Sequence, residues 1–196
     1  MVDKNIEKSK SEESYEVSLK LRNFEIDLFW KRALFFWGFI ASAFWGLIEV
    51  KTKHPEFAPL VAGFGVICSL CWLLTNRGSK RWHENWEQNW EKYGKEGNFI
   101  DESIYKPVEI KNKGLLGACK YSPSKLSILL SYFVLVLWLI VFVNEVFVVF
   151  IQPAEYNSYC FCLLDVRILM AIISIIITII GILFALLCAK SSEEDK

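Results

Sequence analysis

Apolar residues gather in four long blocks along the chain, and polar segments separate these blocks. The first block includes an uncharged run from Ala33 to Ile48, with Lys31 and Arg32 directly before it. A transmembrane helix needs about 20 mostly apolar residues, and each block reaches about that length. A soluble domain would instead place polar residues at helical or strand spacing throughout. The pattern therefore predicts an all-α membrane protein with four transmembrane helices.

The same pattern divides the chain into segments. We expect a disordered tail over residues 1–12, because this stretch is charged and poor in apolar residues. No Gly or Pro interrupts the chain from there to Gly38, so one long helix that includes the first span is predicted over residues 13–50. The remaining segments are a second span at 58–75, a polar connection at 76–124, a third span at 125–150, an external loop at 151–167, a fourth span at 168–188 and a C-terminal tail at 189–196.

Lys and Arg are distributed unevenly between the two sides of the predicted membrane. If both termini and the connection at 76–124 share one side, only Lys51, Lys53 and Arg167 lie on the other. Basic residues favour the cytoplasmic side, so both termini are predicted to be cytoplasmic. At a rise of about 1.5 Å per residue, the first helix is then more than about 50 Å long and extends into the cytoplasm.

Small residues recur at helical spacing within the spans, including a face of Ala58, Ala62, Gly65 and Ser69 in the second span. Such residues let helices approach closely in lipid, where packing drives association. Gly and Ser are also simply common in spans, and the sequence leaves open whether a partner helix belongs to the same chain. The candidate packing residues are Gly38, Ser42 and Gly46 in the first span, and Ala171, Ser174, Thr178, Gly181 and Ala185 in the fourth.

Ionisable residues avoid the middle of every predicted span, which argues against a proton-coupled transporter. Several polar residues are expected at the outer boundary instead, since Glu145 follows Lys125 by about 30 Å of helix. We favour a ring of interfacial ion pairs there over the alternative, an outer vestibule or ion site. The candidate ring consists of Glu49, Asn144, Glu145, Asp165 and Arg167.

The residue sets that enzymes use are missing from this sequence. It shows no paired carboxylates, no Ser–His or Cys–His set and no metal-ligand spacing on one side of the membrane. Cys68 and Cys71 form a CxxC pair, but an apolar helix denies them the polar access that redox or zinc chemistry requires. Cys160 and Cys162 lie on the predicted outer side, which can be oxidising. We therefore expect no enzymatic activity, no cofactor and no metal site.

The stretch GSKRWHENWEQNWEKY predicts an amphipathic, cytoplasmic helix over residues 79–93. Its Trp82, Trp86 and Trp90 share one helical face, which we expect to be covered by lipid headgroups, by the long first helix or by a neighbouring subunit. Interleaved glutamates and a net charge of zero argue against nucleic-acid binding. The first helix offers an apolar face of Leu21, Phe24 and Leu28, and the two faces together suggest a cytoplasmic collar between subunits.

Two of these segments resemble the RipA family of bacterial inner-membrane proteins. They are LRNFEIDLFWKRALFFWGFIA (Leu21–Ala41) and SKRWHENWE (Ser79–Glu87), followed in the same order by SPSK (Ser122–Lys125). The resemblance implies an octamer in the bacterial inner membrane without enzymatic activity. We therefore predict a homo-oligomeric membrane assembly or scaffold whose expected partners are its own copies and membrane lipids. An oligomeric pore or effector channel is the alternative.

Overall fold

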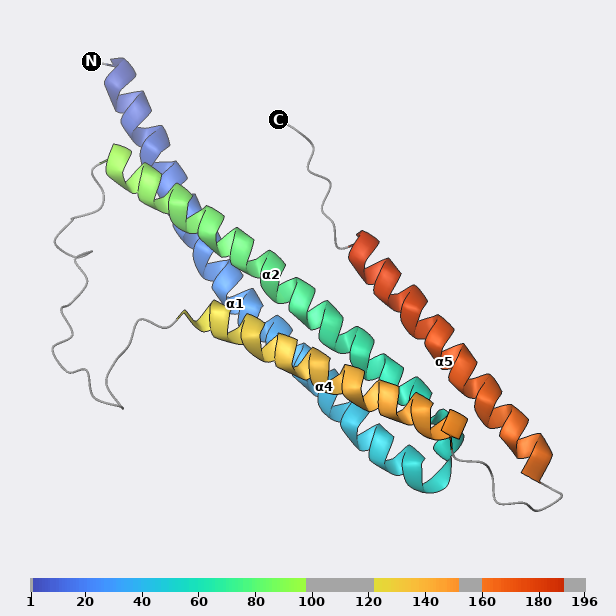
Figure 1. Cartoon of the computed structure of the whole chain (residues 1–196). Helices are drawn as coiled ribbons and strands as arrows, with labels where there is room; N and C mark the ends of the chain where they lie inside the picture. Colours follow the sequence, from blue (N-terminus) through green and yellow to red (C-terminus); the bar gives the residue numbers. More distant parts are fainter. Residues whose placement is uncertain (1, 98–121, 152–159, 189–196) are drawn as a thin grey trace, which may run out of the picture. The chain divides into compact units, whose positions relative to one another are not determined.

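The computed structural model describes residues 2–97, 122–151 and 160–188. Within these ranges the chain is helical and contains no strand. The elements in chain order are α1 (Val2–Lys53), the short 3-10 helix η1 (Pro55–Phe57), α2 (Ala58–Glu96), α4 (Pro123–Ile151) and α5 (Cys160–Cys188) (Figure 1).

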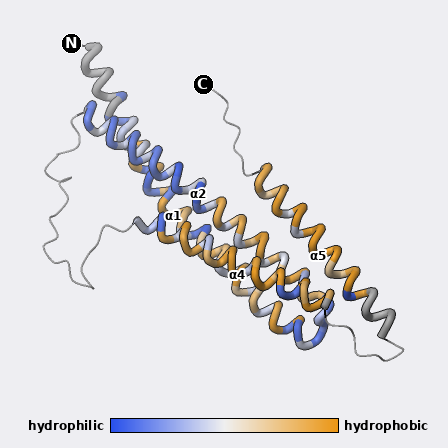
Figure 2. Tube along the Cα trace, viewed as in Figure 1, coloured by the Kyte–Doolittle hydropathy of each residue, from blue (hydrophilic) through white to orange (hydrophobic). Residues whose placement is uncertain are grey.

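The α-helices carry the four apolar blocks, and all 4 are long and apolar enough to cross a membrane. Figure 2 shows α4 and α5 as hydrophobic along most of their described length, whereas α1 and α2 each have a hydrophobic half and a more hydrophilic half. The predicted fold class, an all-α membrane protein with four transmembrane helices, is confirmed.

Helix α1 is longer than the sequence pattern indicated. It begins at Val2, whereas we expected a disordered tail over residues 1–12. Neither Gly nor Pro occurs between Val2 and Trp37, so the backbone meets no residue that would end a helix. At the other end, Lys51 and Lys53 occupy the last turn, where cations interact favourably with the helix dipole.

Helix α2 joins two segments that we predicted as separate, the second span at 58–75 and the Trp-rich helix at 79–93. They form one continuous helix from Ala58 to Glu96. Gly78 lies between the two segments, but a single Gly costs a helix only about 1 kcal/mol. Ser79 is buried in the middle of α2 and does not cap a helix start. One helix therefore carries both the span and the tryptophans.

Helix α4 agrees with the predicted third span, whereas α5 begins earlier than the fourth. The helix starts at Cys160, so it takes in part of the stretch at 151–167 that we predicted as an external loop. No Gly or Pro lies between Ala154 and Ile180, and this absence lets the helical conformation extend before Arg167.

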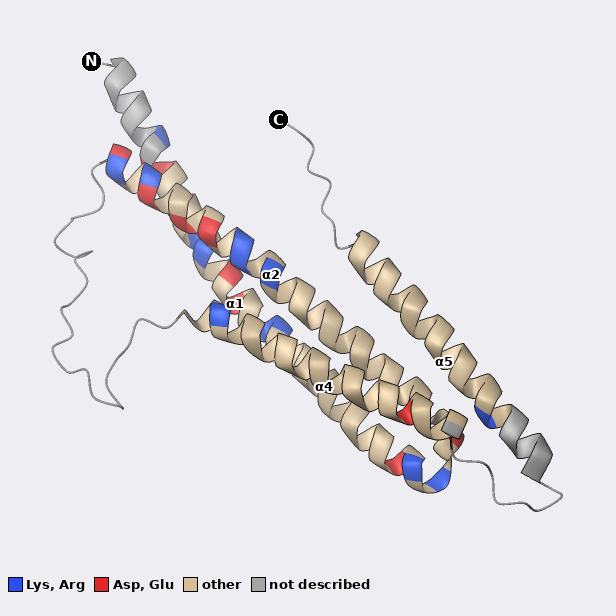
Figure 3. Ribbon diagram, viewed as in Figure 1, with Lys and Arg blue, Asp and Glu red and all other residues tan. Residues whose placement is uncertain are grey.

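The chain divides into two compact units, which are described separately below. The polar unit comprises Met1–Lys31 and Asn76–Leu126, and the apolar unit comprises Arg32–Thr75 and Ser127–Lys196. Figure 3 shows that the charged residues of α1 and α2 are concentrated in the parts that belong to the polar unit. In the apolar unit, Arg32 is the first residue of the α1 part, and the other charged residues of the described helices lie toward helix ends (Figure 3).

The core of the apolar unit is centred on Trp138 of α4, whose side chain has no exposed surface. It packs in one cluster with Ala43 of α1 and with Ala62 and Val66 of α2. The ring of Phe44 lies 4.4 Å from the Trp138 ring, measured between centroids. Aromatic side chains bury about 150–250 Å² each, so this single tryptophan joins three helices.

Candidate functional site

The small residues of α5 are buried within the apolar unit. Ala171 and Ser174 have no exposed surface, and Thr178 is also buried. Ser174 Oγ donates a hydrogen bond of 2.7 Å to the carbonyl oxygen of Met170, which satisfies the hydroxyl within its own helix. Thr178 Oγ1 occupies the space that a Cβ atom would take at Gly63 of α2. This part of the predicted α5 seam therefore packs against α2 of the same chain.

At two further glycines of the apolar unit, the missing side chain leaves room for a side chain of a neighbouring helix. A Cβ atom at Gly181 of α5 would lie 2.5 Å from Ile67 Cδ1 of α2, and one at Gly65 of α2 would overlap the indole of Trp138. Ala185 is half-buried at the end of the α5 seam. The structure thus assigns Gly181 to packing within the subunit, and it adds Trp138, which sequence reasoning did not select.

The small residues of the first span are placed differently. A Cβ atom added at Gly38 would meet nothing within 4 Å, whereas one at Gly46 would lie 3.8 Å from Val61 Cγ1 of α2. Ser42 is exposed, and its Oγ donates a hydrogen bond of 2.8 Å to the carbonyl oxygen of Gly38. Gly46 therefore faces α2, while Gly38 and Ser42 form a shallow notch on the open side of α1.

Large apolar side chains surround this notch on α1. Leu34 is 73% exposed, Phe35 is 62% exposed and Trp45 is 74% exposed. They stand on the same side of the helix as Gly38, one turn before it and two turns after it. The open face of α1, defined here as Leu34, Phe35, Gly38, Ser42 and Trp45, is thus apolar and has a gap at its centre.

An ion pair links α1 and α4 at the predicted outer boundary. Lys51 Nζ donates a hydrogen bond of 2.6 Å to Glu145 Oε1. The Glu145 side chain is 7% exposed and that of Lys51 is 50% exposed, so the lysine neutralises a carboxylate that would otherwise be buried alone. Glu49 pairs with Lys53 one turn later on α1. These contacts favour the interpretation of this level as interfacial ion pairs.

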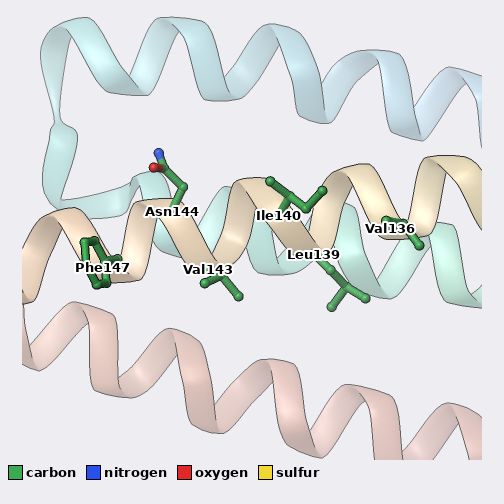
Figure 4. Close-up of a pocket in the computed structure, with 6 residues that line it drawn as sticks. All are labelled: Val136, Leu139, Ile140, Val143, Asn144 and Phe147. Atoms are coloured by element: carbon green, nitrogen blue, oxygen red, sulfur yellow. The ribbon is translucent and has the colours of Figure 1, made fainter.

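Asn144 and Arg167 of the predicted boundary ring do not join these pairs. Asn144 is exposed on α4, and Arg167 is half-buried on α5. The side chain of Asp165 lies outside the described residues. Asn144 is the one polar residue that lines a groove of about 460 Å³, whose other lining residues are Val136, Leu139, Ile140, Val143 and Phe147 (Figure 4). Because these walls are hydrocarbon, the groove suits an acyl chain or an apolar side chain rather than an ion.

In the polar unit, α1 and α2 are held together by rings and charges. The rings of Tyr15 and Trp90 stack with centroids 6.1 Å apart. The Arg22 guanidinium lies 5.7 Å from the centre of the Trp90 ring, and Arg22 Nη2 lies 3.6 Å from Glu87 Oε1. Arg22 therefore combines a cation–π contact with an ion pair.

Sequence reasoning gave the first helix as one possible cover of Trp86 and Trp90, but it missed the rest of this seam because the buried positions are mostly polar. Phe29 is the apolar exception, and its ring lies 5.6 Å from that of His83 between centroids. The positions that face the partner helix nevertheless follow the 3–4 spacing that is typical of paired helices. They are Tyr15, Ser18, Arg22, Glu25 and Phe29 on α1, and Asn76, Ser79, His83, Trp86 and Trp90 on α2. A search for this spacing regardless of polarity could have found them.

The predicted tryptophan face is divided between two roles. Trp90 contacts Tyr15 and Arg22 of the same chain, and Trp86 is half-buried. Trp82 is 54% exposed, and its ring stacks on Trp86 with centroids 6.3 Å apart. On α1, Leu21 and Leu28 are half-buried and Phe24 is 57% exposed. Only Phe24 and Trp82 of the proposed collar residues thus remain largely open in the polar unit.

A metal or redox centre gains no support from the described side chains. They contain no group of three or more His, Cys, Asp or Glu that could hold a metal ion. Cys68 and Cys71 are free and half-buried on α2. They lie among apolar residues of the second span, where a thiolate is unfavourable.

These features define a four-span α-helical membrane protein whose first two helices continue into a polar helical pair. The chain belongs to the octameric membrane protein family (8xMP), whose model matches residues 12–147. The match covers most of α1, all of α2 and most of α4, and it ends before α5. No curated protein and no solved structure matches the chain. The family fits the resemblance noted in the sequence, while the narrower assignment to RipA stays a prediction.

Proposed function

We propose that this chain is the subunit of a non-enzymatic homo-octamer that forms an assembly or scaffold in the bacterial inner membrane. The observation that carries the proposal is the open face of α1 with its notch at Gly38 and Ser42. The description of the family as octameric supports the number of copies. The absence of a catalytic residue set from the sequence supports a structural role over an enzymatic one.

The argument for self-assembly rests on which small residues the subunit itself uses. The small residues of α5 and α2 meet side chains of the same chain, as Thr178 meets Gly63. Gly38 meets no side chain within 4 Å, and Ser42 has satisfied its hydroxyl within α1. In lipid, helices associate mainly through close packing at such positions. A helix of a second copy would fill the notch, and eight repetitions of one such contact would close a ring.

The polar unit is proposed to lie in the cytoplasm, with both termini on that side. The distribution of Lys and Arg supports this orientation. There Phe24 and Trp82, both more than half exposed, would contribute to contacts between neighbouring copies or with the membrane surface. Trp90 would act within each subunit, since it already packs on Tyr15.

A conducting pore is not favoured as a second function. The hydroxyl residues best suited to line water in the spans are Ser127, Ser131, Ser174 and Thr178; Ser127 is half-buried and the other three are buried within the subunit. Ser131 Oγ also donates a hydrogen bond of 2.8 Å to the carbonyl oxygen of Ile128. They would therefore present no polar face to the axis of a ring.

The test is native mass spectrometry of the purified full chain in mild detergent. We expect a discrete octamer for the natural protein. The double variant Gly38→Leu, Ser42→Leu should fill the notch and shift most of the protein to single subunits, because two bulky side chains prevent close helix approach. The matched control Ser42→Ala keeps the notch and should keep the octamer.

Two outcomes would contradict the proposal. A mass that corresponds to one or two copies of the natural protein would show that the octamer does not form. An octamer that survives the double leucine variant would show that the interface lies elsewhere than the open face of α1. Circular dichroism at 222 nm separates both outcomes from unfolding, because it reports the helical content of each variant.

A further inference from the structure

A second open surface lies on α2, just beyond the apolar stretch of the second span. Arg77, Gly78 and Arg81 are exposed there, and Trp82 is 54% exposed. Residues three or four positions apart are neighbours on a helix, so Gly78 lies beside both Arg81 and Trp82. A Cβ atom added at Gly78 would meet nothing within 4 Å. The surface is therefore a small open notch at Gly78, flanked along the helix by the exposed residues Arg77, Arg81 and Trp82.

The acidic residues of this part of α2 form ion pairs with residues other than Arg77. Glu84 pairs with Lys80 at 3.4 Å, Glu87 pairs with Arg22 of α1 at 3.6 Å and Glu91 pairs with Lys95. Arg77 forms no ion pair with any side chain of the described ranges. The positive charge that Arg77 brings to the notch is therefore not compensated by an ion pair with a described side chain.

The position of the notch along α2 indicates which kind of anion it would bind. The apolar stretch ends at Thr75, and Arg77 follows within about 3 Å of helix rise. From Arg77 to Trp82 the helix rises by about 7.5 Å. A headgroup layer is about 5–8 Å thick, which is half the difference between the whole bilayer and its hydrocarbon core. For a helix that continues along the membrane normal, the notch would span the depth of one layer of lipid headgroups.

We propose that Arg77, Arg81 and Trp82, arranged around Gly78, form a binding site for the phosphate headgroup of an anionic phospholipid. Guanidinium groups bind phosphate oxygens with two parallel hydrogen bonds. Tryptophan prefers the boundary between hydrocarbon and water. The missing side chain at Gly78 gives the headgroup room to approach the helix. A free phosphate ion would use the arginines alone and would gain nothing from the position at the membrane boundary.

The test is native mass spectrometry of the full chain after equilibration with equal amounts of phosphatidylglycerol and phosphatidylcholine that carry the same acyl chains. We expect preferential retention of phosphatidylglycerol. The variant Arg77→Gln, Arg81→Gln should reduce this preference about tenfold or more, since each basic residue near an anionic surface contributes a factor of about five. The matched control Lys92→Gln removes an exposed cation from the same face about 22 Å further along the helix from Arg77, and it should leave the preference unchanged.

A second variant tests the notch without altering charge. Gly78→Leu fills the open space and raises helix propensity. A reduced retention of bound phosphatidylglycerol by this variant therefore cannot come from unwinding of α2. Asn85→Leu, which adds the same side chain on the same exposed face two turns later, should retain the lipid. Equal retention of both lipids by the natural protein would overturn the proposal, as would unchanged retention by the charge variant or by Gly78→Leu. The number of copies in the same spectra reports on self-assembly independently.

Discussion

The apolar unit brings its helices together where a glycine faces a large side chain, whereas the polar unit pairs α1 with α2 through rings and charges. Gly65 receives the indole of Trp138 and Gly63 receives Thr178. In the polar unit, Arg22 contacts both Trp90 and Glu87. The difference follows from the solvent that each unit is built for. Without a hydrophobic driving force in lipid, helices need close fit, while in water rings and ion pairs can join polar helices.

The largest expected effect comes from disturbing the close fit at Gly65. Gly65→Ala would push a methyl group into Trp138 and should lower the free energy of unfolding by about 1–3 kcal/mol. Gly78→Ala makes the same change on the same helix at an open position, and it should be neutral or stabilise by up to about 1 kcal/mol. Unfolding in sodium dodecyl sulfate, followed by circular dichroism, measures both. Equal changes in the free energy of unfolding for the two variants would contradict the distinction between a closely packed glycine in the apolar unit and an open glycine in the polar unit.

An effect of at most similar size is expected at the Lys51–Glu145 ion pair, and it should be asymmetric. Lys51→Met leaves the buried Glu145 carboxylate without its partner and should cost about 1–3 kcal/mol. Glu145→Gln leaves the half-exposed Lys51 ammonium, which water can still solvate, and should cost less than about 1 kcal/mol. The measurement is the free energy of unfolding in the same detergent assay. A larger loss for Glu145→Gln would mean that Lys51 is the less well solvated partner.

The smallest expected effect separates the tryptophans of the polar unit. Trp90→Ala removes the contacts with Tyr15 and Arg22 and should weaken the pairing of α1 with α2 by about 1–2 kcal/mol. Trp82→Ala removes an exposed ring and should change the pairing by less than about 0.5 kcal/mol. Hydrogen exchange of the backbone amides at residues 15–29 measures the difference. Faster exchange in Trp82→Ala than in Trp90→Ala would contradict the assigned roles.

The main features of the fold could be predicted because apolar block length alone identifies a membrane span. The ends of the helices could not, since α1 extends through polar sequence and α5 through the mixed stretch CFCLLDVR, and neither extension contains a Gly or Pro. The break predicted before Ser79 was wrong for a related reason. A glycine is a weak signal within a helix, and the burial of Ser79 in the polar unit outweighs it.

The candidate sites could be predicted only in part. The spacing of Ala171, Ser174 and Thr178 indicated a packing seam, but it could not identify Gly63 of α2 as the surface opposite Thr178. Lys51 and Glu145 were expected at one level, yet their pairing depends on which faces of α1 and α4 turn toward each other. The seam at Arg22 was not recognised, because its polar residues carry no hydrophobic signal.

What the sequence by itself determined is the set of four spans, their apolar character and the small-residue positions, since each depends on residues close together in the chain. The tertiary structure decided which of these positions are already filled. Gly181 and Gly38 have the same chemistry, but Ile67 covers the first and nothing within 4 Å covers the second. Only packing between distant segments makes that distinction, because a helix presents every face equally until a neighbour occupies one of them.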